Sequence, residues 1–185
     1  INDHYHAPEA DQFEAKDDDS PLTRADLASH HLLSDGLRAL RPSLPVLSEE
    51  SSDADKARRH EWPVLWMVDP LDGTKEFLAR TGEFTVNIAL IADHRPVLGI
   101  IYQPLRSQAY VGIPGKWARR YTLPDDGVRA LSTRPLVQGS PLTVLASRRH
   151  RGPRLQANLE WLGEHWGDIE RDNSGSALKF CQLAA

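Results

Sequence analysis

A short segment of the chain carries the residues with the clearest chemical potential. It reads Asp69-Pro70-Leu71-Asp72-Gly73-Thr74 and directly follows the hydrophobic run 64–68. Two carboxylates at this spacing can both face a hard divalent cation, and the turn between them can add the carbonyl oxygen of Leu71. Gly73 lets the backbone approach a ligand closely, and the amides of Gly73 and Thr74 open a helix whose positive end suits a phosphate oxygen. Asp-Pro and Asp-Gly are also common turn dipeptides, so the segment alone is equally consistent with a plain turn.

Further carboxylates lie upstream of this turn. Glu49 and Glu50 follow the short β-type run 46–48, where a carboxylate at a strand end could complete a magnesium site. Asp26 follows Thr23 with the spacing of a capping box, with Asp in place of the usual Glu or Gln. Taken singly, an acidic pair is usually solvated and Asp26 is usually a helix cap. Their joint presence favours a metal site.

The elements that must position these residues are helices mixed with short strands. We expect residues 1–19 to be extended or loop, then a helix after Pro21 with Leu33, Leu37 and Leu40 on one apolar face, ending at Arg41-Pro42. A short helix is expected over 75–80 and a mobile charged connection over 51–60. The expected strands are 46–48, 64–68, 85–91, 97–102 and 108–111, the last three as an antiparallel meander.

A second pattern of elements begins after the Pro- and Arg-rich passage 124–141. A buried strand is expected over 142–147, a helix over 155–162, and a further apolar helix over 178–185. The fold class is therefore α/β, more narrowly an α+β layered sandwich. We expect an N-terminal metal-binding domain over 1–139 and the start of a C-terminal α/β domain over 140–185.

Composition limits the classes of function. The chain has 185 residues, 40% of them hydrophobic and 26% charged, with a net charge of −4. This charge gives no general reason to expect binding to duplex nucleic acid. The single cysteine, Cys181, suits a reducing compartment, and no apolar run is long enough to be a transmembrane segment. A cytoplasmic protein is expected, with peripheral contact at the inner membrane left open, and the five tryptophans are expected to be packing residues.

Several motifs together resemble the inositol monophosphatase family. Its successive metal-site motifs are similar to residues 23–26 (Thr-Arg-Ala-Asp), 47–50 (Leu-Ser-Glu-Glu) and 66–74 (Trp-Met-Val-Asp-Pro-Leu-Asp-Gly-Thr), in the family's order and approximate spacing. Residues 82–90 and 174–180 match as well. The resemblance implies the layered sandwich of the sugar phosphatases and a magnesium-dependent phosphomonoesterase with two or three Mg²⁺ ions.

The resemblance also implies a role for individual residues. Glu49, Asp69, the carbonyl of Leu71, Asp72 and Thr74 would surround the magnesium ions, and Asp26 would serve a further, weaker metal position. Glu49 and Thr74 would orient and help deprotonate the attacking water. Clustered metals screen the phosphate charge, lower the pKa of a bound water and stabilise the leaving oxygen, so the assignment is chemically coherent.

Within this family, Lys75-Glu76-Phe77 after Gly73-Thr74 resembles the 3′(2′),5′-bisphosphate nucleotidases. In the resembling enzymes, the positions of Ser176 and Lys179 hold the 5′-phosphate of the nucleotide, and His150 matches a histidine associated with nucleotide binding in some relatives. The implied reaction is hydrolysis of the 3′-phosphate of 3′-phosphoadenosine 5′-phosphate to AMP and phosphate, a role in sulfate assimilation. Considered alone, Lys179 reads as a solvent-facing helix residue and Ser176 as a helix N-cap.

Two other functions stay open from the sequence. One is a family phosphatase acting on inositol or sugar monophosphates. The other is a non-catalytic metal- or nucleotide-binding fragment, because the family's Trp-Asp motif, whose aspartate binds the second magnesium, does not occur after the Ser-x-x-Lys helix. We expect the fold to be incomplete at both ends, lacking a first helix and the rest of the second domain. Assembly as a homodimer is a further open expectation.

Overall fold

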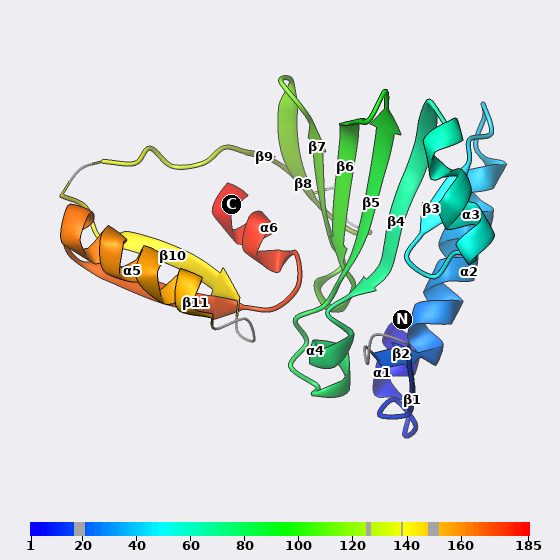
Figure 1. The fold of residues 1–185 in the computed structure, drawn as a ribbon, viewed down its shortest axis with the longest axis horizontal. Helices are drawn as coiled ribbons and strands as arrows, with labels where there is room; N and C mark the ends of the chain where they lie inside the picture. The colour runs from blue at the N-terminus through cyan, green and yellow to red at the C-terminus, as the bar shows by residue number, and fades with distance from the viewer. Residues whose placement is uncertain (17–20, 125–126, 138, 148–151) are drawn as a thin grey trace.

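A seven-stranded mixed sheet forms the centre of the molecule (Figure 1). The computed structural model describes residues 1–16, 21–124, 127–137, 139–147 and 152–185. The strand order follows the chain, from β3 to β9. The strands are β3 (Val46–Ser48), β4 (Val64–Asp72), β5 (Thr85–Ala92), β6 (Arg95–Gln103), β7 (Gln108–Ile113), β8 (Trp117–Thr122) and β9 (Gly127–Leu131).

The strands from β4 to β9 form one antiparallel meander, which confirms the expected strands and their arrangement. The meander continues beyond the prediction, through β8 and β9. These two strands were not predicted from the sequence because their apolar residues are interrupted by Arg119 and Arg120 on β8 and by Arg129 on β9, the strand at the open edge of the sheet.

In the seven-stranded sheet as described, β3 and β4 form the one parallel pair, and this pairing brings two motifs together. Ser48 is paired with Val68, and the amide of Glu49 continues the ladder by donating to the carbonyl of Val68 at 3.0 Å. Parallel strands end at the same edge, so the residues after β3 lie beside the end of β4. The residues 69–72, expected to form a turn, instead prolong β4 with a shift of register against β5 between Asp69 and Asp72.

Helix α2 (Arg24–Ala39) packs against β3 and β4. Its N-terminus is a complete capping box, because the Thr23 side chain accepts from the amides of Ala25 and Asp26 while Asp26 accepts from the Thr23 amide. Its buried residues include Ala25 and Ser29, small side chains that let the helix approach the sheet closely. The expected apolar face was wrong at its end, because Leu40 is exposed where the helix has already stopped.

The first residues are better ordered than the sequence indicated. They form α1 (Asn2–His6), β1 (Phe13–Ala15) and β2 (Pro21–Thr23). The ring of Tyr5 lies 5.3 Å from Phe77 and 5.1 Å from Phe84, at the centre of the main buried cluster. A single aromatic ring that fits between two others draws α1 into the core, so the prediction of an extended surface segment over 1–19 was wrong around Tyr5, whereas the exposed strand β1 agrees with it.

Two shorter helices flank the site and the sheet edge. Residues 51–60, expected to be a mobile connection, form α3 (Asp53–Arg58), capped by Ser52, and the 3₁₀ turn η1 (Arg59–Glu61). Helix α4 (Thr74–Leu78) follows Gly73, as expected, and η2 (Pro104–Arg106) joins β6 to β7.

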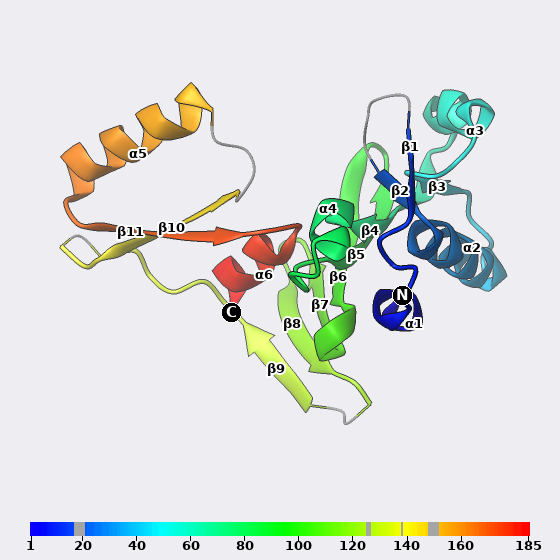
Figure 2. The same cartoon turned by 90° about the horizontal axis from the view of Figure 1, so that it is seen from below.

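The last part of the chain forms a separate two-stranded parallel sheet. Strand β10 (Leu142–Ser147) pairs along its whole length with β11 (Ile169–Ser174), and α5 (Pro153–Trp166) connects them. Helix α6 (Leu178–Ala184) lies between this pair and the large sheet, on the side away from α1 and α2 (Figure 1, Figure 2). The division into domains at residue 139 stays a prediction.

The tryptophans do not all pack as expected. Trp161 is 57% exposed on α5, where its ring stacks on His165 at 4.3 Å, so that expectation was wrong for this residue. No helix within the described residues is long and apolar enough to cross a membrane.

Candidate metal and phosphate site

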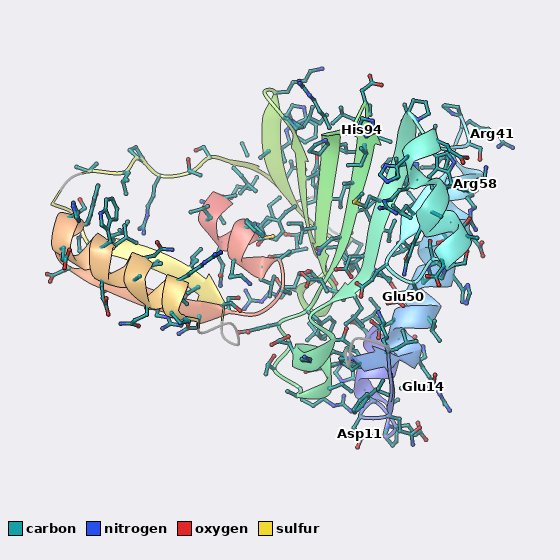
Figure 3. The ribbon with its side chains drawn as sticks, in the orientation of Figure 1. Asp11, Glu14, Arg41, Glu50, Arg58 and His94 are labelled. Atoms are coloured by element: carbon teal, nitrogen blue, oxygen red, sulfur yellow. The ribbon has the colours of Figure 1, made fainter. Side chains whose placement is uncertain are left out.

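The carboxylates of the site gather where β3 and β4 end. Glu49 follows β3 and Asp69 lies at the matching level of β4, so the parallel pairing carries both to one edge. Burial, reinforced by the negative charges of Glu49 and Asp72, raises the pKa of Asp69 to about 7. Both burial and nearby like charges disfavour the ionised form of a carboxyl group. Figure 3 shows Glu50 nearer to the α4 end of the sheet than His94, which lies in the β5–β6 turn at the opposite end.

Asp26 reaches the cluster from the N-terminus of α2. Its Oδ2 accepts from the amide and hydroxyl of Thr23, and its Oδ1 lies 3.3 Å from the Thr74 hydroxyl. That hydroxyl also lies 3.2 Å from the carbonyl oxygen of Leu71, so it can donate to either acceptor. Burial raises the pKa of Asp26 against the opposing hydrogen bonds from Thr23. Asp26, Leu71 and Thr74 are thus brought together as the sequence predicted.

Asp72 is held by residues that sequence reasoning did not single out. Its Oδ2 accepts from Asn87 Nδ2 at 3.1 Å, Thr85 Oγ1 at 3.4 Å and the amide of Ala177 at 2.6 Å. Thr85 and Asn87 are recognisable only from strand register, because β5 places Asn87 opposite Asp69 and Thr85 opposite Asp72. Among the described residues, the Asn87 Oδ1 atom is one of four buried polar side-chain atoms without a partner.

Gly73 and Ser176 come into contact across the two parts of the chain. Gly73 has φ +94°, and a Cβ atom there would lie 2.9 Å from the Glu83 carbonyl oxygen and 3.2 Å from the Ser176 Cβ. Only glycine fits both the backbone conformation and the space. Lys179 turns back over the same loop, donating to the carbonyl of Ser174 at 3.2 Å and to that of Ser176. It is therefore not the solvent-facing residue that one reading of the sequence offered.

Some of these groups line one cleft of about 430 Å³, whereas Asp26, Glu49 and Thr74 are not among its lining residues. One wall is formed by the end of β4 and the start of α4, and the other by the turn between β11 and α6. Its lining includes Asp69, Asp72, Gly73, Ser176 and Lys179. Carboxylates for a cation and an ammonium group for an anion thus face the same space.

Lys16 is a further residue that the sequence did not bring forward. Its Nζ lies 2.8 Å from Glu49 Oε1 and 2.6 Å from Glu50 Oε1. Burial lowers the pKa of Lys16, but the hydrogen bonds to Glu49 and Glu50 outweigh this effect and the pKa is raised. Lys16 therefore supplies one positive charge to the cluster.

The donor set fits a hard divalent cation. Four carboxylates and the Leu71 carbonyl offer only oxygen ligands, the kind that Mg²⁺ prefers, and burial together with the neighbouring Glu49 and Asp72 carboxylates raises the pKa of Asp69. Within the described residues, no three His, Cys, Asp or Glu side chains are already arranged so that they could hold a metal ion together. Asp72 accepts from the Ala177 amide through Oδ2 and Glu49 accepts from Lys16 through Oε1, so each carboxylate keeps a second oxygen for a cation. His150, also expected near the nucleotide, lies outside the described residues.

Comparisons with known proteins assign the chain to a family. The inositol monophosphatase family model matches residues 1–185, and the chain belongs to that family. It is 44% identical over 173 residues to the 3′(2′),5′-bisphosphate nucleotidase CysQ of Salmonella typhimurium, covering 94% of this chain and 66% of that relative. The chain thus spans just under two thirds of the length of this curated relative.

Solved structures agree with this assignment. CysQ from Bacteroides thetaiotaomicron, described as a bacterial member of the inositol monophosphatase family, superposes with a TM-score of 0.79 at 37% identity, covering 99% of this chain and 70% of that one. An IMPase/NADP phosphatase complexed with Mg²⁺ and phosphate gives a TM-score of 0.67 at 18% identity, covering 92% and 61%. The latter identity supports a shared fold alone. The expected layered α/β fold is confirmed.

Proposed function

We propose that the protein hydrolyses the 3′-phosphate of 3′-phosphoadenosine 5′-phosphate, giving AMP and phosphate, with Mg²⁺ as the metal. The observation that carries the proposal is the shared cleft, whose lining includes Asp69, Asp72 and Gly73 together with Ser176 and Lys179. One substrate with two phosphates can occupy both walls at once. The similarity to the 3′(2′),5′-bisphosphate nucleotidase CysQ of Salmonella typhimurium supports the choice of substrate.

The residues that would hold the metal are Glu49, Asp69, the carbonyl of Leu71 and Asp72, with Asp26 at a further position. Two or three ions are expected. Bound Mg²⁺ supplies positive charge to the phosphate oxygens and lowers the pKa of a coordinated water.

The protein's own groups orient the reactants. The Thr74 hydroxyl, fixed by Asp26 and the Leu71 carbonyl, can accept a hydrogen bond from the attacking water, and Glu49 can take its proton. The backbone at Gly73 lets the phosphate come close, because no side chain intervenes. Attack of water on phosphorus then breaks the bond to the 3′-oxygen, which leaves with a proton. Ser176 and Lys179 hold the 5′-phosphate throughout, and His150 stays a prediction for the nucleotide.

The test is phosphate release by the full chain in Mg²⁺ from three substrates: the 3′,5′-bisphosphate, adenosine 3′-monophosphate and inositol 1-phosphate. We expect kcat/KM for the bisphosphate to exceed the others by about tenfold or more, the effect of one charge-assisted contact. Turnover of inositol 1-phosphate above that of the bisphosphate would contradict the proposal.

Asp72→Asn is the matching variant. Because asparagine keeps the volume and can still accept from Ala177, the fold should survive, while the lost ligand charge should lower Mg²⁺-dependent turnover by at least about a hundredfold. Asp93→Asn, in the exposed β5–β6 turn, is the control and should retain full activity. Circular dichroism checks that both variants remain folded.

Assembly and location are predictions of the same proposal. Homodimer formation finds some support in Phe180 and Leu183, which are 65% and 61% exposed on α6. A cytoplasmic location is supported by the single free cysteine, Cys181, whose burial raises its pKa to about 12. Sedimentation of the protein measures homodimer formation. Cell fractionation measures its location, including peripheral association with the inner membrane.

A further inference from the structure

Two carboxylate-to-amide hydrogen bonds attach the turn 174–177 to the large sheet. Asp72 Oδ2 accepts from the amide of Ala177 at 2.6 Å, and Glu83 Oε2 accepts from the amide of Gly175 at 2.8 Å. Glu83 lies between α4 and β5, and 92 positions separate it from Gly175 in the sequence. A hydrogen bond to an ionised acceptor is among the stronger ones that proteins make.

The space around this contact leaves little freedom. A Cβ atom at Gly175 would lie 2.7 Å from Glu76 Cγ, 3.1 Å from the Glu83 carbonyl oxygen and 3.1 Å from Glu83 Oε2. Gly175 is buried, so its backbone lies directly against Glu83 with no side chain between them. The turn therefore packs closely against the sheet, and Glu83 forms much of the surface that it contacts.

The contact between Gly175 and Glu83 determines the position of the candidate phosphate-binding groups. Ser176 follows Gly175 directly and has φ +47°, a conformation that a residue other than glycine seldom adopts without support. Lys179 donates to the carbonyls of Ser174 and Ser176, so its ammonium group moves with the same turn. Displacing Gly175 would shift both the serine and the lysine.

Asp72 and Glu83, the two carboxylates that accept from the turn, differ in whether they belong to the proposed metal site. Asp72 belongs to the carboxylate cluster, and any cation there competes with Ala177 for its oxygen. Glu83 is not one of the residues proposed to hold the cation, so its bond to Gly175 does not depend on a carboxylate that the cation would use.

We propose that Glu83 is a positioning residue that fixes the turn 174–177, and through it Ser176 and Lys179, at the distance needed to recognise the second phosphate of the substrate. The identity of that substrate rests on the function proposed above. Glu83 makes no contact with the reacting phosphate in this scheme. Its loss should therefore change the selection of substrate and leave the chemical step unchanged.

The experiment compares Glu83→Ala, Glu83→Gln and Glu164→Ala in the full chain with Mg²⁺. Glutamine keeps an oxygen that can accept from Gly175, and Glu164 is an exposed glutamate on α5 that serves as the control. For Glu83→Ala we expect KM for the 3′,5′-bisphosphate to rise about tenfold, with kcat and the kinetics of adenosine 3′-monophosphate unchanged. Glu83→Gln should recover at least half of this loss on a logarithmic scale, and Glu164→Ala should match the parent.

Hydrogen exchange gives a readout independent of activity. Amides of residues 174–178 should exchange faster in Glu83→Ala than in the parent or in Glu164→Ala. An equal loss with both nucleotides would overturn the proposal, because Glu83 would then be only structural, and so would unchanged KM and exchange. If the parent protein does not prefer the bisphosphate, the proposed function fails on its own, while the exchange data still decide whether Glu83 holds the turn.

Discussion

At the scale of single residues, Asp69 shows that the site is built at the expense of stability. Its carboxyl group is buried beside Glu49 and Asp72, and these three charges repel one another unless a cation lies between them. A folded-state pKa of about 7, against an ordinary value of 3.8, means that the native protein binds the proton more tightly than the unfolded chain. In metal-free protein this raises stability at low pH and reduces it as the pH rises from about 4 to about 7.

Asp69→Asn should therefore stabilise the metal-free protein at pH 7.5. Relief of the repulsion should raise Tm by about 2–4 °C for each kcal/mol removed in a chain of this size. The variant should also lose most of the Tm increase that Mg²⁺ gives the parent, since binding to the native state is what stabilises it. Thermal scans with EDTA and with Mg²⁺ measure both effects. An unchanged response to Mg²⁺ would show that Asp69 is not a ligand.

At the scale of elements, α2 is coupled to the site by its first turn. The capping box of Thr23 and Asp26 serves two purposes, because it satisfies the amides at the helix N-terminus and fixes the carboxylate that meets Thr74. A helix whose cap is also a site residue cannot shift along the sheet without disturbing the chemistry. Ser29, which donates to the Pro70 carbonyl at 2.8 Å, fastens the same helix to the end of β4.

Thr23→Ala should cost about 1–2 kcal/mol of unfolding free energy through loss of the cap. Activity should fall as well, because Asp26 loses the hydroxyl that donates to it. Thr23→Ser keeps the hydroxyl and should recover most of both. Ser52→Ala removes the cap of the exposed helix α3 and serves as the control, with a smaller loss of stability and no loss of activity. Urea unfolding and initial rates measure these outcomes, and a Thr23→Ala protein with normal kinetics would separate the cap from the site.

At the scale of the whole molecule, the cleft exists because two distant parts of the chain meet. The end of β4 supplies carboxylates, and the turn between β11 and α6 supplies Ser176 and Lys179. Lys179 uses two of the three donors of its ammonium group on backbone carbonyls, and it lines the cleft. The arrangement favours a ligand with two separated phosphates.

Lys179→Ala should weaken the binding of the bisphosphate much more than the binding of a monophosphate. The lost charge-assisted contact should raise KM for the 3′,5′-bisphosphate about tenfold or more, while that for adenosine 3′-monophosphate changes less than about twofold. Lys116→Ala, in the exposed β7–β8 turn, removes the same charge away from the cleft and should have no effect. Steady-state kinetics on both nucleotides are the measurement. Equal losses would remove the argument for a second phosphate site.

The sequence by itself determined the family, the main strands and the ligand types. Local patterns were enough for these, because the Asp69–Thr74 motif is contiguous and the strands from β4 to β7 are plainly apolar. It failed where a distant partner decides the outcome: Tyr5 is buried only because Phe77 and Phe84 leave room for its ring.

Only the tertiary structure decided which groups act together in the site. Parallel pairing of β3 with β4 sets Glu49 beside Asp69, and the register of β5 supplies Asn87 to Asp72. The hydrogen bond from the Gly175 amide to Glu83 joins residues far apart in the chain, and no local pattern encodes such a contact. The physical reason is that spacing along the chain fixes which atoms are available, while strand register and packing fix the distances between them.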